Sequence, residues 1–150
     1  MKDLTWFESG KTLNTHQIDA TEQQLEVKFP PDYISVVKDH SGASNPDECE
    51  FRYIDKERVR IGNFGTLLSL CNEQPNNVLE VIENLGDQLP KKIVPIIETG
   101  SGDYICFDYR IEKIPFVIYF SHERLNEEAI IPLTQTFTEF LENLKQPIEE

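Results

Sequence analysis

The chain has 150 residues, of which 39% are hydrophobic, and it carries a formal net charge of −13. A single domain of this length buries enough apolar surface to fold without a metal ion or disulfides. The negative charge repels phosphate backbones and anionic lipid headgroups, so it argues against direct binding to nucleic acid or to a membrane surface. The same charge would attract a basic protein partner, although it also serves solubility alone.

The three cysteines, Cys49, Cys71 and Cys106, are odd in number and form no CxxC pair. This pattern argues against a disulfide framework or a structural zinc site and favours reduced thiols. The N-terminal residues MKDLTWFESG lack the apolar core of a signal peptide. The longest apolar run, Ile114–Phe120, is too short to span a bilayer. We therefore expect a cytoplasmic protein.

The chain reads as one domain over residues 1–150, with an N-terminal flap over 1–14 and a frayed end over 146–150. In the flap, Trp6 could be a partner anchor or a lid on the core. Thr15 to Phe29 is predicted to be a helix that Thr15 caps and that Pro30 and Pro31 end.

A second helix is predicted from Pro31, because Tyr33, Val36, Val37 and His40 follow the i, i+3, i+4, i+7 spacing of an amphipathic face. His40, at the end of that face, could be a ligand or base, or could simply place positive charge at the helix C-terminus.

After a polar loop over Ser41–Glu48, short strands are predicted at Glu50–Ile54, Val59–Ile61 and Thr66–Leu70. The one basic cluster of the chain alternates with acids here and comprises Arg52, Lys56, Arg58 and Arg60. We interpret it as a solvated strand face with cross-strand ion pairs.

Asn76 or Asn77 is predicted to cap a third helix, which Gly86 ends. Ile93–Asp108 is predicted to be a central hairpin, with Pro95 at a bulge or strand start and glycines in the turn. Its return strand places Ile105, Phe107 and Tyr109 on one face, and Tyr104, Cys106 and Asp108 on the other.

A third strand is predicted over Pro115–Ser121, a long acidic loop over His122–Pro132, and a last helix capped by Thr134 or Thr136. The succession of strands and turns indicates an antiparallel meander.

We find no phosphate-binding loop, nucleophile elbow or zinc-protease motif. Glu98, Asp103, Asp108 and His122 could converge around the sheet as a metal or acid–base site, although 27 acidic residues make such sets common by chance. We expect no enzyme activity, no cofactor and no metal. The other use of the acids is recognition, because aromatic residues ringed by carboxylates suit a basic protein surface. These aromatic residues could equally be half-buried sheet residues.

Three segments of the chain resemble the SUKH superfamily, which includes fungal cell-wall-assembly regulators and many bacterial toxin-immunity proteins. The first is Glu22–Gly42, EQQLEVKFPPDYISVVKDHSG, with an E-x-x-L followed by hydrophobic-Pro-x-x-Tyr. The second is Ile93–Asp108, with GSGDYICFD at its centre. The third is Pro115–Tyr119 with His122, followed by TFTEFL at Thr136–Leu141.

The resemblance implies an α+β domain, with helices packed on a mostly antiparallel sheet that we expect to contain five to six strands. It also implies a non-enzymatic cytoplasmic protein that binds and neutralises a cognate secreted toxin, commonly a nuclease. The alternative within the same superfamily is a regulatory adaptor or scaffold. The residues that we expect to contact a partner are acidic or aromatic residues near the sheet: Glu48, Glu50, Asp103, Tyr104, Asp108, Tyr119 and Glu123.

Overall fold

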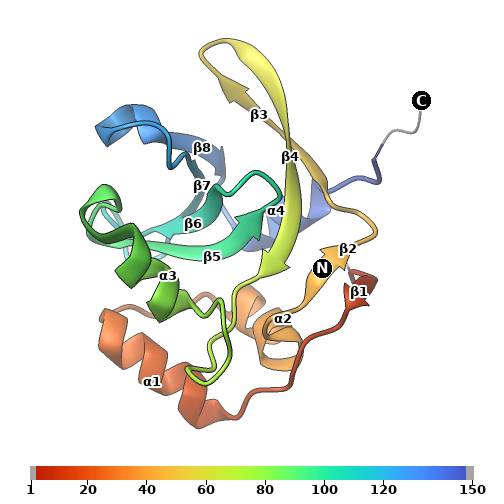
Figure 1. The fold of residues 1–150 in the computed structure, drawn as a ribbon, viewed down its shortest axis with the longest axis vertical. Helices are drawn as coiled ribbons and strands as arrows, with labels where there is room; N and C mark the ends of the chain where they lie inside the picture. The colour runs from red at the N-terminus through yellow and green to blue at the C-terminus, as the bar shows by residue number, and fades with distance from the viewer. Residues whose placement is uncertain (1–2, 148–150) are drawn as a thin grey trace.

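The computed structural model describes residues 3–147, which form an α+β domain (Figure 1). In this part of the chain there are four α-helices: α1 (Thr15–Leu25), α2 (Pro31–His40), α3 (Val78–Leu85) and α4 (Phe137–Glu142). Eight strands form one sheet: β1 (Trp6–Glu8), β2 (Ser44–Pro46), β3 (Glu50–Asp55), β4 (Arg58–Leu67), β5 (Ile93–Thr99), β6 (Tyr104–Asp108), β7 (Phe116–Phe120) and β8 (Ile130–Thr134). Two short 3₁₀ segments, Gly86–Gln88 and Asn126–Ala129, complete the described elements.

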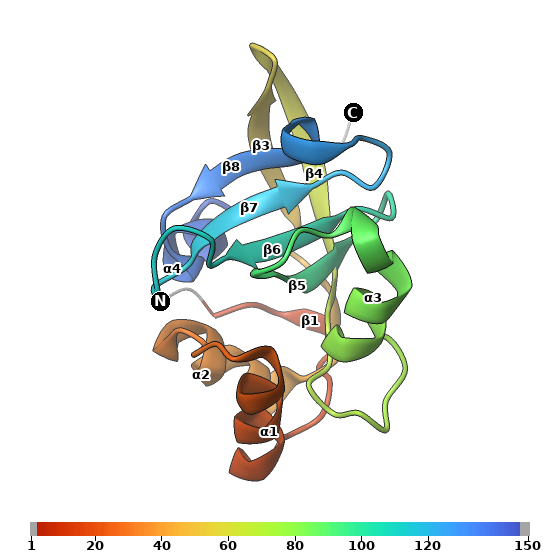
Figure 2. The ribbon, with the colours of Figure 1, turned by 90° about the vertical axis from the view of Figure 1, so that its left-hand side faces the viewer.

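The sheet is antiparallel throughout, in the order β1-β2-β4-β5-β6-β7-β8, and β3 pairs with β4 beside this path. The first half of β4 pairs with β3 and its second half with β5. The β3–β4 hairpin therefore projects from the body as an arm (residues 50–61), at the top of Figures 1 and 2.

The two faces of the sheet carry different apolar clusters, as the alternation in the return strand predicts. Ile105 and Phe107 belong to the main core, which α1, α2 and α4 help to form. In that core the ring of Tyr33 from α2 meets Phe107 and Phe137 edge to face, with centroids 5.1 and 5.5 Å apart. Cys106 lies in a smaller cluster on the other face. Figure 2 shows β5–β8 side by side, with α1 and α2 below them and α3 to one side.

Several predicted element ends are confirmed. The side chains of Asn77 and Thr136 cap α3 and α4 by accepting backbone hydrogen bonds, and Gly86 ends α3 with a φ of 54°. A register shift at Pro95 places the predicted bulge in β5, and Gly102 has the positive φ, 85°, that the hairpin turn requires.

The first helix was predicted too long, because it ends at Leu25 rather than Phe29. Glu26 adopts a left-handed φ of 58°, which terminates the helical hydrogen bonds before the prolines. The N-cap of α1 is Asn14 and not the predicted Thr15. Asn14 forms a reciprocal capping box with Gln17.

The predicted strand count of five to six was too low. β1 and β2 are three-residue strands in stretches that carry little strand pattern. β8 begins inside the predicted acidic loop. It was not predicted because it contains Pro132, and proline within a run argues against a strand. The strands predicted at Val59–Ile61 and Thr66–Leu70 are parts of one strand, β4, that ends at Leu67 and bends through a bulge near Gly65.

The N-terminal flap is partly strand β1, and its Trp6 packs on Phe64 and on His40, with ring centroids 5.4 and 5.6 Å apart. His40 ends α2, and its Nδ1 lies 2.7 Å from the carbonyl oxygen of Ser9. The predicted frayed end at 146–150 falls mainly outside the described residues, which stop at 147.

Candidate functional site

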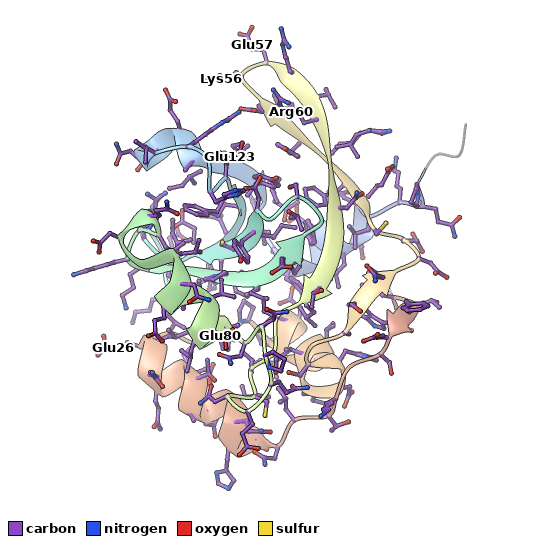
Figure 3. The ribbon with its side chains drawn as sticks, viewed as in Figure 1. Glu26, Lys56, Glu57, Arg60, Glu80 and Glu123 are labelled. Carbon is purple, nitrogen blue, oxygen red and sulfur yellow. The ribbon has the colours of Figure 1, made fainter. Side chains whose placement is uncertain are left out.

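A polar pocket of about 310 Å³ lies between the arm and strands β7 and β8; we call it the inner pocket. Its lining combines the inner face of the arm, the β5–β6 turn and the loop that follows β7. The lining residues are Tyr53, Asp55, Arg60, Asp103, Tyr119, Ser121, Glu123, Arg124 and Ile131. Figure 3 shows Arg60 on the arm and Glu123 below it, with Lys56 and Glu57 at the tip.

Two tyrosines form one wall of the inner pocket. The rings of Tyr53 and Tyr119 stack with centroids 4.5 Å apart and planes 17° from parallel. The Tyr119 hydroxyl donates to Oδ2 of Asp103 at 2.6 Å. Burial and then this hydrogen bond raise the pKa of Tyr119 well above its ordinary value, so the phenol stays protonated and remains a donor.

Asp103 organises the loop after β7. Its Oδ1 accepts the backbone N–H of His122 at 2.9 Å and also contacts Nδ1 of the His122 ring. With Tyr119 on Oδ2, both carboxylate oxygens are used inside the protein. Asp103 therefore positions the Tyr119 and His122 side chains and has little capacity left for a partner's donors.

Asp55 fixes the arm over the pocket. Its carboxylate accepts two hydrogen bonds from the Arg124 guanidinium, at 2.7 and 2.6 Å, and Arg60 lies 2.9 Å away. Hydrogen bonding to Arg124, together with the charges of Arg124 and Arg60, holds the pKa of Asp55 below its usual range although burial opposes this. This bidentate pair joins the arm to the loop after β7.

Glu123 is the open carboxylate of the inner pocket. Its side chain is 82% exposed, and its nearest ionic neighbour is Nε2 of His122 at 3.9 Å. An exposed carboxylate of this kind can pair with a basic side chain of a partner without breaking a strong ion pair inside the protein. Glu127 and Glu128, in the short 3₁₀ segment that follows, extend the negative charge, and Lys56 at the arm tip reaches Glu128 at 4.0 Å.

Three of the expected contact residues, Asp103, Tyr119 and Glu123, meet in this pocket. Tyr104 is close by in sequence, half-buried and paired in register with Phe120 and Glu98. Glu48 and Glu50 lie at the root of the arm, where Glu50 lines a separate groove with Arg52 and Lys145.

Asp108 does not join this surface, contrary to its place in the expected set. It lies at the opposite end of β6 and is 5% exposed. Arg110 binds it at 3.0 Å and continues to Glu127 at 3.0 Å, which ties the loop after β7 across the sheet. A buried carboxylate that already has an arginine is unsuited to partner contact.

Glu98, Asp103, Asp108 and His122 do not come together as one site, because Asp108 lies at the other end of β6. Asp103 and His122 meet, but Asp108 is bound to Arg110 elsewhere. Among residues 3–147 no group of three or more His, Cys, Asp or Glu side chains could hold a metal ion.

Sequence reasoning missed the Asp55–Arg124 pair. The two residues are 69 positions apart, and neither belongs to a motif. Only the cross-strand part of the network, Asp55 with Arg60, follows from the alternating charges of the predicted strands.

A larger pocket, of about 610 Å³, lies between the end of α1 and the loop after β6, and none of the expected contact residues lines it. Its acids and bases balance, with Glu22, Glu26 and Glu112 against Lys28, Lys92 and Lys113. Glu22 accepts the backbone N–H of Phe29 at 2.7 Å, so it braces the turn into α2.

None of the helices in the described part of the chain combines the length and apolar character that a membrane span requires. A relative in Bacillus subtilis (strain 168), the SPbeta prophage-derived uncharacterized protein YokK, is 26% identical over 168 residues, covering 99% of this chain and 85% of that protein. The SMI1/KNR4 family (SUKH-1) matches residues 12–143, which include the arm, the inner pocket and the central hairpin. The chain therefore belongs to the SMI1/KNR4 family, SUKH-1.

Proposed function

We propose that this protein is an immunity protein, which binds a cognate secreted toxin and neutralises it by stoichiometric occlusion. The toxin would be a basic protein, a nuclease, held through the acidic surface around the inner pocket. The observation that carries the proposal is the 82% exposed Glu123 at the mouth of a pocket that Asp103 and the buried Tyr119 brace from inside, on a chain of net charge −13. Family membership supports it, as does a relative whose name assigns that protein to a prophage.

The surface suits inhibition by charge. A nuclease carries bases that hold phosphates, and the field of a −13 chain attracts such a protein before contact. Glu123 and Glu50 then offer exposed or half-exposed carboxylates on either side of the arm. Asp103 acts indirectly, because it holds Tyr119 and the loop that presents Glu123.

The site would act in the cytoplasm of the cell that makes the toxin. All three cysteines are free, which suits a reducing compartment. The role requires no catalysis and no cofactor, since binding alone blocks the toxin.

The test is co-expression with the toxin domain encoded by the gene next to this one. We expect wild-type protein to restore growth and to form a 1:1 complex in size-exclusion chromatography with light scattering. Failure to rescue growth, with no complex, would refute the proposal. A locus without a toxin gene would instead favour the regulatory adaptor.

A charge-reversal pair locates the surface. Glu50→Lys with Glu123→Lys should slow association about tenfold at low salt and less at high salt. The matched control, Glu73→Lys with Glu83→Lys, makes the same change in net charge at exposed positions away from the arm. Equal association rates for the two pairs would move the interface elsewhere.

A further inference from the structure

The outer face of the arm carries an exposed apolar row. Cross-strand register places Ile54 opposite Val59 and Arg52 opposite Ile61, so these side chains share the face that points away from the inner pocket. Ile54, Val59 and Ile61 are 67%, 68% and 55% exposed. Three β-branched apolar residues side by side on a projecting hairpin favour contact with another protein.

The arm is stiff rather than loosely attached. Its inner face is held by the Asp55–Arg124 ion pair and by the stacking of Tyr53 on Tyr119. At its base, the buried Phe51 packs on Phe140 of α4, with ring centroids 5.3 Å apart. The outer apolar row is therefore presented in a fixed position, which lowers the entropy cost of binding.

The turn at the tip of the arm is formed by two non-glycine residues in the left-handed region. Lys56 and Glu57 form the two-residue turn with φ values of 49° and 68°. Hairpin turns with both residues at positive φ favour Asn-Gly, and other residues are destabilising there. Both residues are exposed at the far end of the arm (Figure 3), and Lys56 reaches Glu128 at 4.0 Å. Residues in such strained conformations cluster at functional sites, which motivates a test at this tip.

The charge of the arm differs from that of the rest of the chain. Residues 52–60 contain four bases and two acids within a chain of net charge −13. Arg60 is bound to Asp55, whereas Arg52 and Arg58 have no ion pair within residues 3–147. Both guanidinium groups are available to carboxylates of a partner.

We propose that the arm enters a cleft of the toxin as a wedge, an inference that rests on the proposed function. Ile54, Val59 and Ile61 lie against an apolar wall of the cleft, and Arg52 and Arg58 meet carboxylates inside it. The acids around the inner pocket face the basic surface outside the cleft. A second copy of the chain is a poorer occupant because it carries the same −13 charge, and that charge also repels nucleic acid.

The test compares two matched double variants for binding to the same neighbouring toxin domain by surface plasmon resonance. Ile54→Thr with Val59→Thr replaces two of the three residues of the apolar row but keeps β-branched residues in the strands. Ile111→Thr with Ile114→Thr makes the same kind of change at residues that are 75% and 72% exposed on the β6–β7 connection. We expect the arm pair to lose about tenfold or more in affinity through faster dissociation, and the control pair to bind like wild type.

A second variant separates binding from folding. Lys56→Asn with Glu57→Gly should raise the urea midpoint, because these residues suit the turn, while it weakens toxin binding. Weaker binding by a more stable protein excludes unfolding as the cause.

A complex that forms equally with wild type and both arm variants would overturn the wedge and leave the proposed function standing. Absence of any complex would refute the proposed function itself. Concentration-dependent dimers of wild type that the arm pair abolishes would assign the apolar row to self-association and overturn the wedge.

Discussion

Arg124 binds the carboxylate of Asp55 with two hydrogen bonds, at 2.7 and 2.6 Å, across 69 residues of sequence. This pair joins the β3–β4 arm to the loop after β7, and so holds the two sides of the inner pocket together. Asp55 is 5% exposed and the Arg124 side chain 28% exposed, so the pair is only partly screened by water and joins the arm to that loop.

Asp55→Asn should lower the melting temperature at pH 7, since one oxygen and the charge of the pair are lost. The pKa of Asp55 is depressed in the folded protein by Arg124, so its stabilisation is present above the unfolded value of about 3.9 and is lost as pH falls through and below it. The difference between wild type and variant should therefore shrink below about pH 4. Thermal unfolding between pH 7 and pH 3 measures this, with the exposed Asp19→Asn as control. A difference that is constant with pH would contradict the role of the ion pair.

Arg110→Ala should destabilise the protein by about 2 kcal/mol or more, because it leaves Asp108, 5% exposed, without its partner. Glu127→Ala removes only the outer contact of the same arginine, on a side chain that is 82% exposed, and should cost less than about 0.5 kcal/mol. Urea unfolding of both variants makes the comparison. Equal losses would show that Asp108 does not depend on Arg110.

Tyr33→Phe should leave stability unchanged or raise it by up to about 1 kcal/mol. The Tyr33 side chain is fully buried, and its hydroxyl has no hydrogen-bond partner among residues 3–147. Removing that group keeps the ring contacts with Phe107 and Phe137. A clear loss of stability in chemical denaturation would mean that the hydroxyl is satisfied, for example by a buried water.

Gly62→Ala should destabilise the root of the arm by about 2 kcal/mol. A Cβ at Gly62 would lie 2.3 Å from Cζ of Phe51, which is buried in the core. At Gly100 the nearest atom to an added Cβ is 3.9 Å away, so Gly100→Ala is the matched control and should have little effect. Urea midpoints distinguish them, and similar midpoints would show that Phe51 moves aside freely.

The three thiols should differ in reactivity toward a disulfide reagent such as DTNB. Cys49 and Cys71 are partly exposed, whereas Cys106 is fully buried in β6 and burial raises its pKa. We expect two thiols to react in the native protein and the third only on unfolding. Rapid reaction of all three would indicate that the central sheet opens readily.

Strong local patterns were sufficient to predict much of the fold. The apolar spacing of α3 and the caps at Asn77 and Thr136 were correct because they depend on neighbours within one turn. The central hairpin followed from the alternation around Gly102. β2, with the sequence SNP, could not be predicted because its pairing with Thr66 is imposed by the tertiary structure.

The candidate site was predicted only in part. Asp103 and Tyr119 meet because Asp103 directly precedes β6, which pairs with β7 as the predicted meander requires. The burial of Asp108 depends on Arg110 turning back onto the strand, which the alternation of β6 does not reveal. The exposed row on the arm was not predicted, because Ile54, Val59 and Ile61 are interspersed with charged residues in the sequence. Only the register of the hairpin places the three side chains on one face.

Neutralisation by one-to-one binding can be measured by titrating this protein into the neighbouring toxin domain and following the nuclease activity of the toxin. Tight stoichiometric inhibition predicts a linear loss of activity that reaches zero at about one equivalent when concentrations far exceed Kd. The pair Glu50→Lys with Glu123→Lys should leave residual activity at that point. Full toxin activity in the presence of about a tenfold excess of wild-type protein, at concentrations where nanomolar binding would saturate, would rule out one-to-one neutralisation.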